Sequence, residues 1–138
     1  MPIDERWARL TDAEWDDFAE AWLRQIRGSG SEDDDEIGQS VVLMNFTASP
    51  ESQWSFLVKA VAHAQSEDEL GHIAAGPLEH LLGKHGASMI DRVEQLAATD
   101  EKFARMLTGA WRYMMSDSVW QRVQALQARV QNPLRTRS

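Results

Sequence analysis

Residues 11–26 read TDAEWDDFAEAWLRQI and contain both the start and the repeat of an amphipathic helix. Thr11 and Glu14 are spaced as a capping box, in which the two side chains satisfy free amide groups at the helix start. Behind them the apolar residues recur every three or four positions, which is the spacing of one helix face. These residues are Trp15, Phe18, Ala19, Trp22, Leu23 and Ile26. We therefore expect a helix that ends near Arg27 and packs two tryptophans on a core.

The chain that follows repeats these helix signals. Ser49-Pro50 predicts a helix start, because serine is a good cap and proline loses little in the first turn. Ser66 and Glu69 are spaced as a second capping box. The run from Ile37 to Phe46 fits a buried strand or a short buried helix, and we favour the helix because no partner strand is evident.

These segments together predict an all-α protein. We expect a compact bundle of six to eight helices in consecutive antiparallel hairpins. A short helical array resembling a repeat protein is the alternative, although no repeat of fixed period is found. A chain of 138 residues has the size of one domain, so we expect a single domain over residues 1–138.

Several features are expected to interrupt or end the helices. Residues 28–36 combine Gly-Ser-Gly-Ser with five consecutive acids and predict a mobile loop, and residues 133–138 predict a short basic tail. Gly76-Pro77 predicts a kinked helix or two helices that meet, because proline removes a backbone hydrogen bond. Lys84-His85-Gly86 predicts a C-terminal helix cap with a left-handed glycine.

The formal net charge of −8 is distributed unevenly along the chain. Residues 1–36 contain twelve acids and four arginines, whereas the stretch from Arg122 onward contains four arginines and no acid. The electrostatic field of such a charge distribution favours the approach of a basic protein and disfavours direct binding of nucleic acid. The absence of cysteine, of a signal peptide and of a long apolar run predicts a cytoplasmic protein that does not enter the membrane.

The acidic run is expected to form a docking site for a partner rich in arginine or lysine. Aromatic residues close to acids have the composition of binding surfaces. Trp7 precedes the first capping box and is expected to be partly covered, while the other tryptophans lie mostly in the core. The predicted partner-binding residues are Trp7, Asp16, Asp17, Glu32, Asp33, Asp34, Asp35 and Glu36.

Residues for catalysis or metal binding form no recognisable set. Glu69 and His72 have the spacing of half a di-iron site, but no second such pair exists. We therefore expect no catalytic residue, metal or cofactor. Glu79 directly follows Gly76-Pro77, and we expect it to interact with free amides of the first turn after the proline. The alternative function is a metal-dependent or small-ligand-binding helical enzyme around His72, Glu79 and His80.

A longer pattern resembles an uncharacterised family of small bacterial all-helical proteins. The resemblance rests on Leu70–Leu82, which contains Ala74-Ala75-Gly76-Pro77-Leu78-Glu79, and on His85-Gly86, Phe103, Leu107 and Trp111, with Asn45-Phe46 and Gln53-Trp54 upstream. It implies a bacterial, cytoplasmic helical domain. Proteins of this kind are similar to the small acidic immunity proteins that neutralise bacterial toxins. We therefore expect a non-enzymatic interaction protein, an immunity-type inhibitor that binds a basic toxin or nuclease through its acidic N-terminal half.

Overall fold

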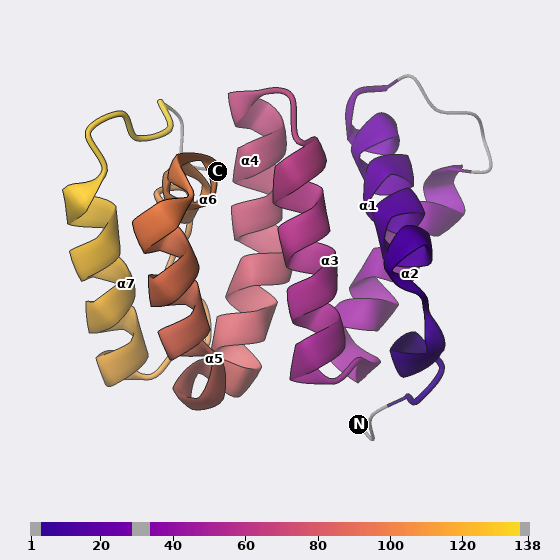
Figure 1. The fold of residues 1–138 in the computed structure, drawn as a ribbon, viewed down its shortest axis with the longest axis horizontal. Helices are drawn as coiled ribbons and strands as arrows, with labels where there is room; N and C mark the ends of the chain where they lie inside the picture. The colour runs from indigo at the N-terminus through magenta and orange to yellow at the C-terminus, as the bar shows by residue number, and fades with distance from the viewer. Residues whose placement is uncertain (1–3, 29–33, 136–138) are drawn as a thin grey trace. The chain divides into compact units, whose positions relative to one another are not determined.

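Every regular element in the described residues of the computed structural model, 4–28 and 34–135, is a helix (Figure 1). The all-α prediction is therefore confirmed. None of the described helices is both long and apolar enough to span a bilayer. In chain order the elements are the 3-10 turn η1 (Trp7–Arg9), α1 (Asp12–Ile26), α2 (Asp34–Thr47), α3 (Pro50–His63), α4 (Glu67–Ile73), the π-helical turn η2 (Ala74–Leu78), α5 (Glu79–Thr99), α6 (Glu101–Leu107) and α7 (Asp117–Arg129).

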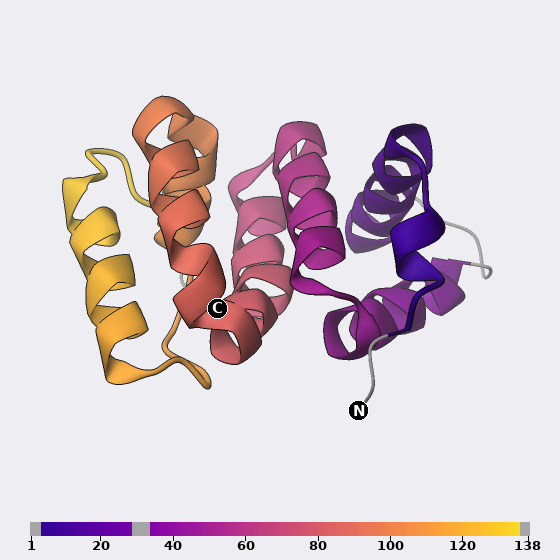
Figure 2. The same cartoon turned by 60° about the horizontal axis from the view of Figure 1, so that its bottom comes forward.

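The helices group into two compact units, residues 1–65 and 66–138. The single domain expected from the chain length stays a prediction. In the first unit α1 packs on both α2 and α3. Figure 2 shows α2 running across the direction of α3. The core of this unit includes Trp15, Ala19, Leu23, Val41, Met44, Phe56, Leu57, Ala60 and Val61.

The helices α1 and α3 begin where the sequence predicts. The backbone N–H of Glu14 donates to Thr11 Oγ1 at 3.1 Å, and the N–H of Thr11 donates to Glu14 Oε1 at 3.0 Å. This completes the predicted capping box. Ser49 caps α3 by accepting from the N–H of Ser52, and Pro50 occupies the first turn.

Helix α2 confirms the predicted helix at residues 37–46 but differs from expectation in two ways. It begins at Asp34, so the predicted loop at 28–36 is wrong for its last three residues. Acids in the first turn of a helix interact favourably with its dipole, which explains why the acidic run does not prevent helix formation. The helix is also buried on one side only, because Val42, Leu43 and Phe46 are exposed.

The tryptophans are less buried than expected. Trp15 is buried, Trp111 is exposed, and Trp7, Trp22, Trp54 and Trp120 are half-buried. The prediction that they lie mostly in the core is therefore wrong, in keeping with the large size of the indole, which is rarely covered completely. Trp15 and Trp22 join an aromatic cluster around Phe56, whose ring centroid lies 5.5 Å from that of Trp22 and 6.4 Å from that of Trp15.

In the second unit the helical path continues through Gly76-Pro77. Helix α4 passes into the π turn η2 and then into α5, and the flanking residues Ile73 and Glu79 keep right-handed helical angles. The sequence predicts a kinked helix or two helices that meet here, and the structure joins α4 and α5 through a π turn, so the helix changes type at this proline. A π turn widens the helix by one residue, which accommodates the missing amide of Pro77.

The predicted helix end at Lys84-His85-Gly86 is confirmed in part, because α5 is interrupted at His85 (φ −126°, ψ 25°), where two helical segments meet at a kink before the second continues to Thr99. The predicted left-handed glycine cap is wrong. Positive φ occurs, among the described residues, at Gly28 and Tyr113 and not at Gly86. Gly86 is instead needed for space, since a Cβ there would lie 2.9 Å from Val119 Cγ2.

Helices α5, α6 and α7 pack on one another in this unit. Their shared core includes Leu81, Leu82, Ile90, Val93, Phe103, Met106, Leu107, Val119 and Val123. After α7 the chain turns back, and the N–H of Leu134 donates to Thr108 Oγ1 at 2.9 Å. Because Leu134 is buried, the predicted tail at 133–138 is wrong at this residue. Residues 136–138 lie outside the described part of the chain.

Candidate interaction surfaces

The net charge of the chain lies on one of its two units. Residues 1–65 contain thirteen acidic and five basic residues, whereas residues 66–138 contain nine of each. The first unit thus carries the whole formal charge of −8, and the second is neutral. The uneven charge seen along the sequence therefore belongs to a unit with its own core.

Helix α1 presents a mixture of paired and unpaired acids. Lys59 Nζ of α3 lies 3.0 Å from Asp12 Oδ2 and 3.9 Å from Asp16 Oδ1. The hydrogen bond to Asp12 raises the pKa of Lys59. Asp17 is exposed and forms no ion pair within the described residues. One lysine therefore offsets part of the charge on this helix and leaves Asp17 available at its surface.

Asp16, one of the predicted partner-binding residues, is held inside its own unit. Its Oδ1 lies 2.7 Å from His63 Nε2, so the pair ties α1 to the end of α3. The Arg27 guanidinium donates to the backbone carbonyl oxygen of His63 at 3.3 Å. Asp16 therefore has an intramolecular role that its neighbour Asp17 does not share.

The acidic run is divided between described and undescribed residues. Glu32 and Asp33 lie outside the described part of the chain. Asp34 and Asp35 are the first residues of α2. Glu36 follows in the same turn and is exposed, without an ion-pair partner among the described residues. The helix thus begins with consecutive acids, of which Glu36 is at the surface.

Trp7 is half-buried, as expected, but it is fixed by its own unit. Its Nε1–H donates to Thr47 Oγ1 at 2.8 Å. Its ring stacks on Phe18 with centroids 5.9 Å apart and an interplanar angle of 9°, and it also contacts Trp15. These contacts connect η1 to α1 and α2, which gives Trp7 a packing role.

The sequence prediction missed an apolar stripe on the outside of α2, formed by Val42, Leu43 and Phe46 and called here the α2 stripe. These side chains are 55%, 43% and 42% exposed. The prediction for Ile37 to Phe46 is a buried helix. The signal that identifies the stripe is that Asn45 is the one polar residue between positions 41 and 46, so this part of the helix has no polar outer side.

Glu79 occupies the first turn of α5, but its carboxylate does not bind the amides of that turn. It is buried, and its Oε2 accepts the backbone N–H of Trp111 at 2.9 Å. Burial raises the pKa of Glu79 and the hydrogen bond from Trp111 partly offsets the rise. The amide that Glu79 satisfies thus belongs to the loop between α6 and α7.

This α6–α7 loop, residues 108–116, exposes a second group of large apolar side chains, Trp111, Tyr113 and Met114. Its backbone is tightly held, since Gln127 Nε2 donates to the carbonyl oxygens of both Leu107 and Ala110. Tyr113 has a φ of 44°, a left-handed conformation that is unfavourable for a bulky residue. The expectation that the tryptophans other than Trp7 lie mostly in the core is wrong for Trp111, because this residue lies in the exposed loop.

The alternative enzyme hypothesis rests on His72, Glu79 and His80, and each of these residues has different surroundings in the structure. His80 Nδ1 forms a hydrogen bond with the carbonyl oxygen of Gly76 at 2.9 Å, and its ring lies 5.2 Å from that of Tyr113. His72 is exposed on α4. Groups of three or more acidic or histidine side chains able to hold a metal ion are not found among the described residues.

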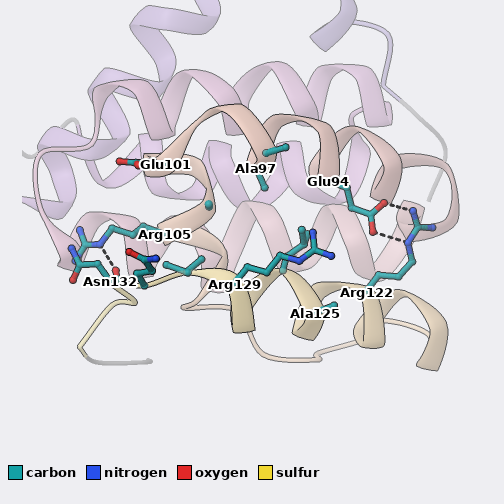
Figure 3. Close-up of a pocket in the computed structure, with 13 residues that line it drawn as sticks. Glu94, Ala97, Glu101, Arg105, Arg122, Ala125, Arg129 and Asn132 are labelled. Atoms are coloured by element: carbon teal, nitrogen blue, oxygen red, sulfur yellow. Dashed lines mark hydrogen bonds and ion pairs between the residues drawn. The ribbon is translucent and has the colours of Figure 1, made fainter.

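Helices α5, α6 and α7 border a groove of about 740 Å³ (Figure 3). Its lining includes Ala97, Ala98, Ala104 and Ala125, and the small side chains leave the groove open. At one end Arg122 pairs with Glu94 and Asp91, which raises its pKa and lowers that of Glu94. At the other end Arg105 donates to the carbonyl oxygen of Asn132 at 2.6 Å. The groove thus combines a largely apolar lining with an arginine at each end that is held by its own chain.

Residues 28–131 match the model of a family of unknown function (DUF6869). The match begins just after α1 and extends through α7, so it includes the α2 stripe, Glu79, the α6–α7 loop and all of the groove except Asn132. No curated protein and no solved structure matches the chain.

Proposed function

Since this chain belongs to the DUF6869 family, whose function is unknown, we propose its function from its surface: it is a non-enzymatic interaction module that binds a basic protein through its acidic first unit. The more specific form of the proposal is an immunity-type inhibitor of a basic toxin or nuclease. The observation that carries it is the location of the entire formal charge of −8 on residues 1–65.

A unit with this charge attracts cationic surfaces over a distance of about 8 to 10 Å at moderate ionic strength. Electrostatic attraction of this kind raises association rates and selects partners of opposite charge more than it adds affinity. Asp17 on α1 and Glu36 on α2 support the proposal, because both are exposed and neither has an ion-pair partner among the described residues. Asp16 contributes less, since it is engaged by His63.

The test uses the basic products of genes adjacent to the one that encodes this chain. Each is purified and its association with the chain is followed by stopped-flow fluorescence at low and high salt. We expect one such product to bind, and the double variant D17N/E36Q to associate about tenfold more slowly at low salt, with a smaller difference at high salt. The variant D33N/D34N/D35N tests the acidic run in the same assay.

The matched control is D68N/D117N, which removes the same number of exposed acids from the second unit. Asp117 pairs with Arg112 at the surface, where such a pair contributes little stability. We expect this control to associate at the rate of the unmodified chain. The proposal is wrong if none of the basic products binds, or if D17N/E36Q and D33N/D34N/D35N both bind as fast as the control at low salt.

A further inference from the structure

Helix α2 is apolar on both of its sides. Val41 and Met44 are buried in the core of the first unit, whereas the α2 stripe is exposed. A helix at the surface of a folded unit normally carries polar residues on its outer side. Contiguous exposed apolar side chains commonly mark a surface that binds another molecule. The packing of the first unit explains why Val41 and Met44 are apolar, but not why the exposed residues of the α2 stripe are apolar.

An acidic residue lies on the same helix face as the stripe. Positions 36, 39, 43 and 46 are separated by three or four residues, so they follow one line along α2. Glu36 and Gln39 are exposed like Leu43 and Phe46. The line therefore changes from acidic and polar at the start of the helix to apolar near its end. An apolar centre beside a polar rim is the usual anatomy of a protein interface.

We propose that the α2 stripe is the apolar centre of the surface that binds the basic partner, an inference that rests on the proposed function. The partner then presents an apolar groove with lysine or arginine at the edge that meets Glu36. Phe46 and Leu43 enter this groove, and Phe46 contributes most because buried aromatic residues dominate interface energetics. The acids of the first unit determine how fast the partner arrives, and the stripe determines how long it stays.

Charge argues for this occupant over a second copy of the same chain. Two first units would each bring a formal charge of −8 to a shared interface, and like charges brought together oppose association. A basic protein with an apolar groove satisfies both the stripe and the surrounding field.

The test measures association and dissociation rates of the basic partner with three forms of the full chain. We expect L43S/F46S to dissociate about tenfold faster or more, with an association rate within about threefold of the unmodified chain. D17N/E36Q shows the opposite pattern, with its main effect on association. The matched control is M114S, which removes an even more exposed apolar side chain from the second unit and leaves both rates unchanged. Circular dichroism checks that the variants remain folded.

The outcomes separate this inference from the proposed function. If none of the basic products binds, both are wrong. If D17N/E36Q slows association while L43S/F46S keeps the dissociation rate of the unmodified chain, the proposed function stands and the inference about the stripe is wrong. The inference is also wrong if sedimentation shows that the unmodified chain is a dimer and that L43S/F46S is a monomer, because the stripe then binds a second copy.

Discussion

Glu79 and Trp111 are 32 residues apart in the sequence, yet the carboxylate of the first accepts the backbone N–H of the second at 2.9 Å. The pair joins the start of α5 to the α6–α7 loop. A buried carboxylate is costly unless it is hydrogen-bonded, and a partly buried amide also needs an acceptor. Each group thus satisfies the other.

Replacing Glu79 with alanine removes the acceptor and leaves the N–H of Trp111 without this partner. We expect E79A to lower the free energy of unfolding by about 1 to 3 kcal/mol, the usual cost of an unsatisfied buried group. Urea denaturation measures the change. The control is E101A, which truncates an exposed glutamate of α6 and is expected to change stability by less than about 0.5 kcal/mol. Equal stability of E79A and E101A would contradict the role assigned to Glu79.

The raised pKa of Glu79 makes stability depend on pH. A carboxyl whose folded pKa lies above its ordinary value of 4.5 stabilises the fold most below that value, where it is protonated in both states. The contribution is lost as pH rises from about 4.5 through the folded pKa. E79Q keeps an acceptor for Trp111 and cannot ionise. We therefore expect the unmodified chain to lose stability relative to E79Q as the pH rises through this range. Denaturation at several pH values measures the free energy of unfolding of both forms. If the two free energies change in parallel with pH, the pKa of Glu79 is not raised.

The neighbouring acids Asp16 and Asp17 are expected to respond differently to the same substitution. Asp16 contacts His63 at 2.7 Å, whereas Asp17 is exposed and makes no ion pair within the described residues. D16N weakens a partly exposed pair and is expected to cost up to about 1 kcal/mol of stability. D17N is expected to change stability by less than about 0.5 kcal/mol. Thermal unfolding of both variants checks the difference, and a larger effect of D17N would reverse the assignment.

Gly86 and Val119 approach so closely that a methyl group does not fit between them. A Cβ at residue 86 would lie 2.9 Å from Val119 Cγ2, so G86A is expected to destabilise the chain by about 1 to 3 kcal/mol. The control is G76A, where a Cβ meets nothing within 4 Å and a loss of stability is not expected. In the double variant G86A/V119A the smaller side chain removes the clash. Denaturation should therefore show a cost for the double variant that is smaller than the sum of the two single costs.

Features that depend on neighbours in the sequence were predicted well. The capping box of Thr11 and Glu14 and the Ser49 cap both involve side chains and amides within three residues, so their spacing determines the contact. The change of helix type at Gly76-Pro77 follows from the missing amide of proline, which is a local property as well. These local signals predicted the all-α class and the starts of α1, α3 and α4.

Features that depend on distant residues could not be read from the sequence. The need for glycine at position 86 is set by Val119 on another helix, and the local sequence indicates only an interruption of the helix near this position. The exposure of Phe46 depends on which side of α2 meets α1, which a run with apolar residues on both sides does not reveal. Two residues of the predicted acidic site, Asp17 and Glu36, are exposed as expected. The pairing of Asp16 with His63 joins residues that are distant in the sequence, so it is seen only in the folded unit.

The π turn η2 sets the rotational phase between α4 and α5. Each residue of an α-helix advances the side-chain direction by about 100°, and a π turn behaves as a one-residue insertion in that count. Deleting the exposed Ala75 would restore the number of residues per turn of an ordinary α-helix. All of α5 would then be rotated relative to α4. Glu79 would then turn away from Trp111, and Gly86 from Val119. One extra residue thus keeps two distant contacts in register.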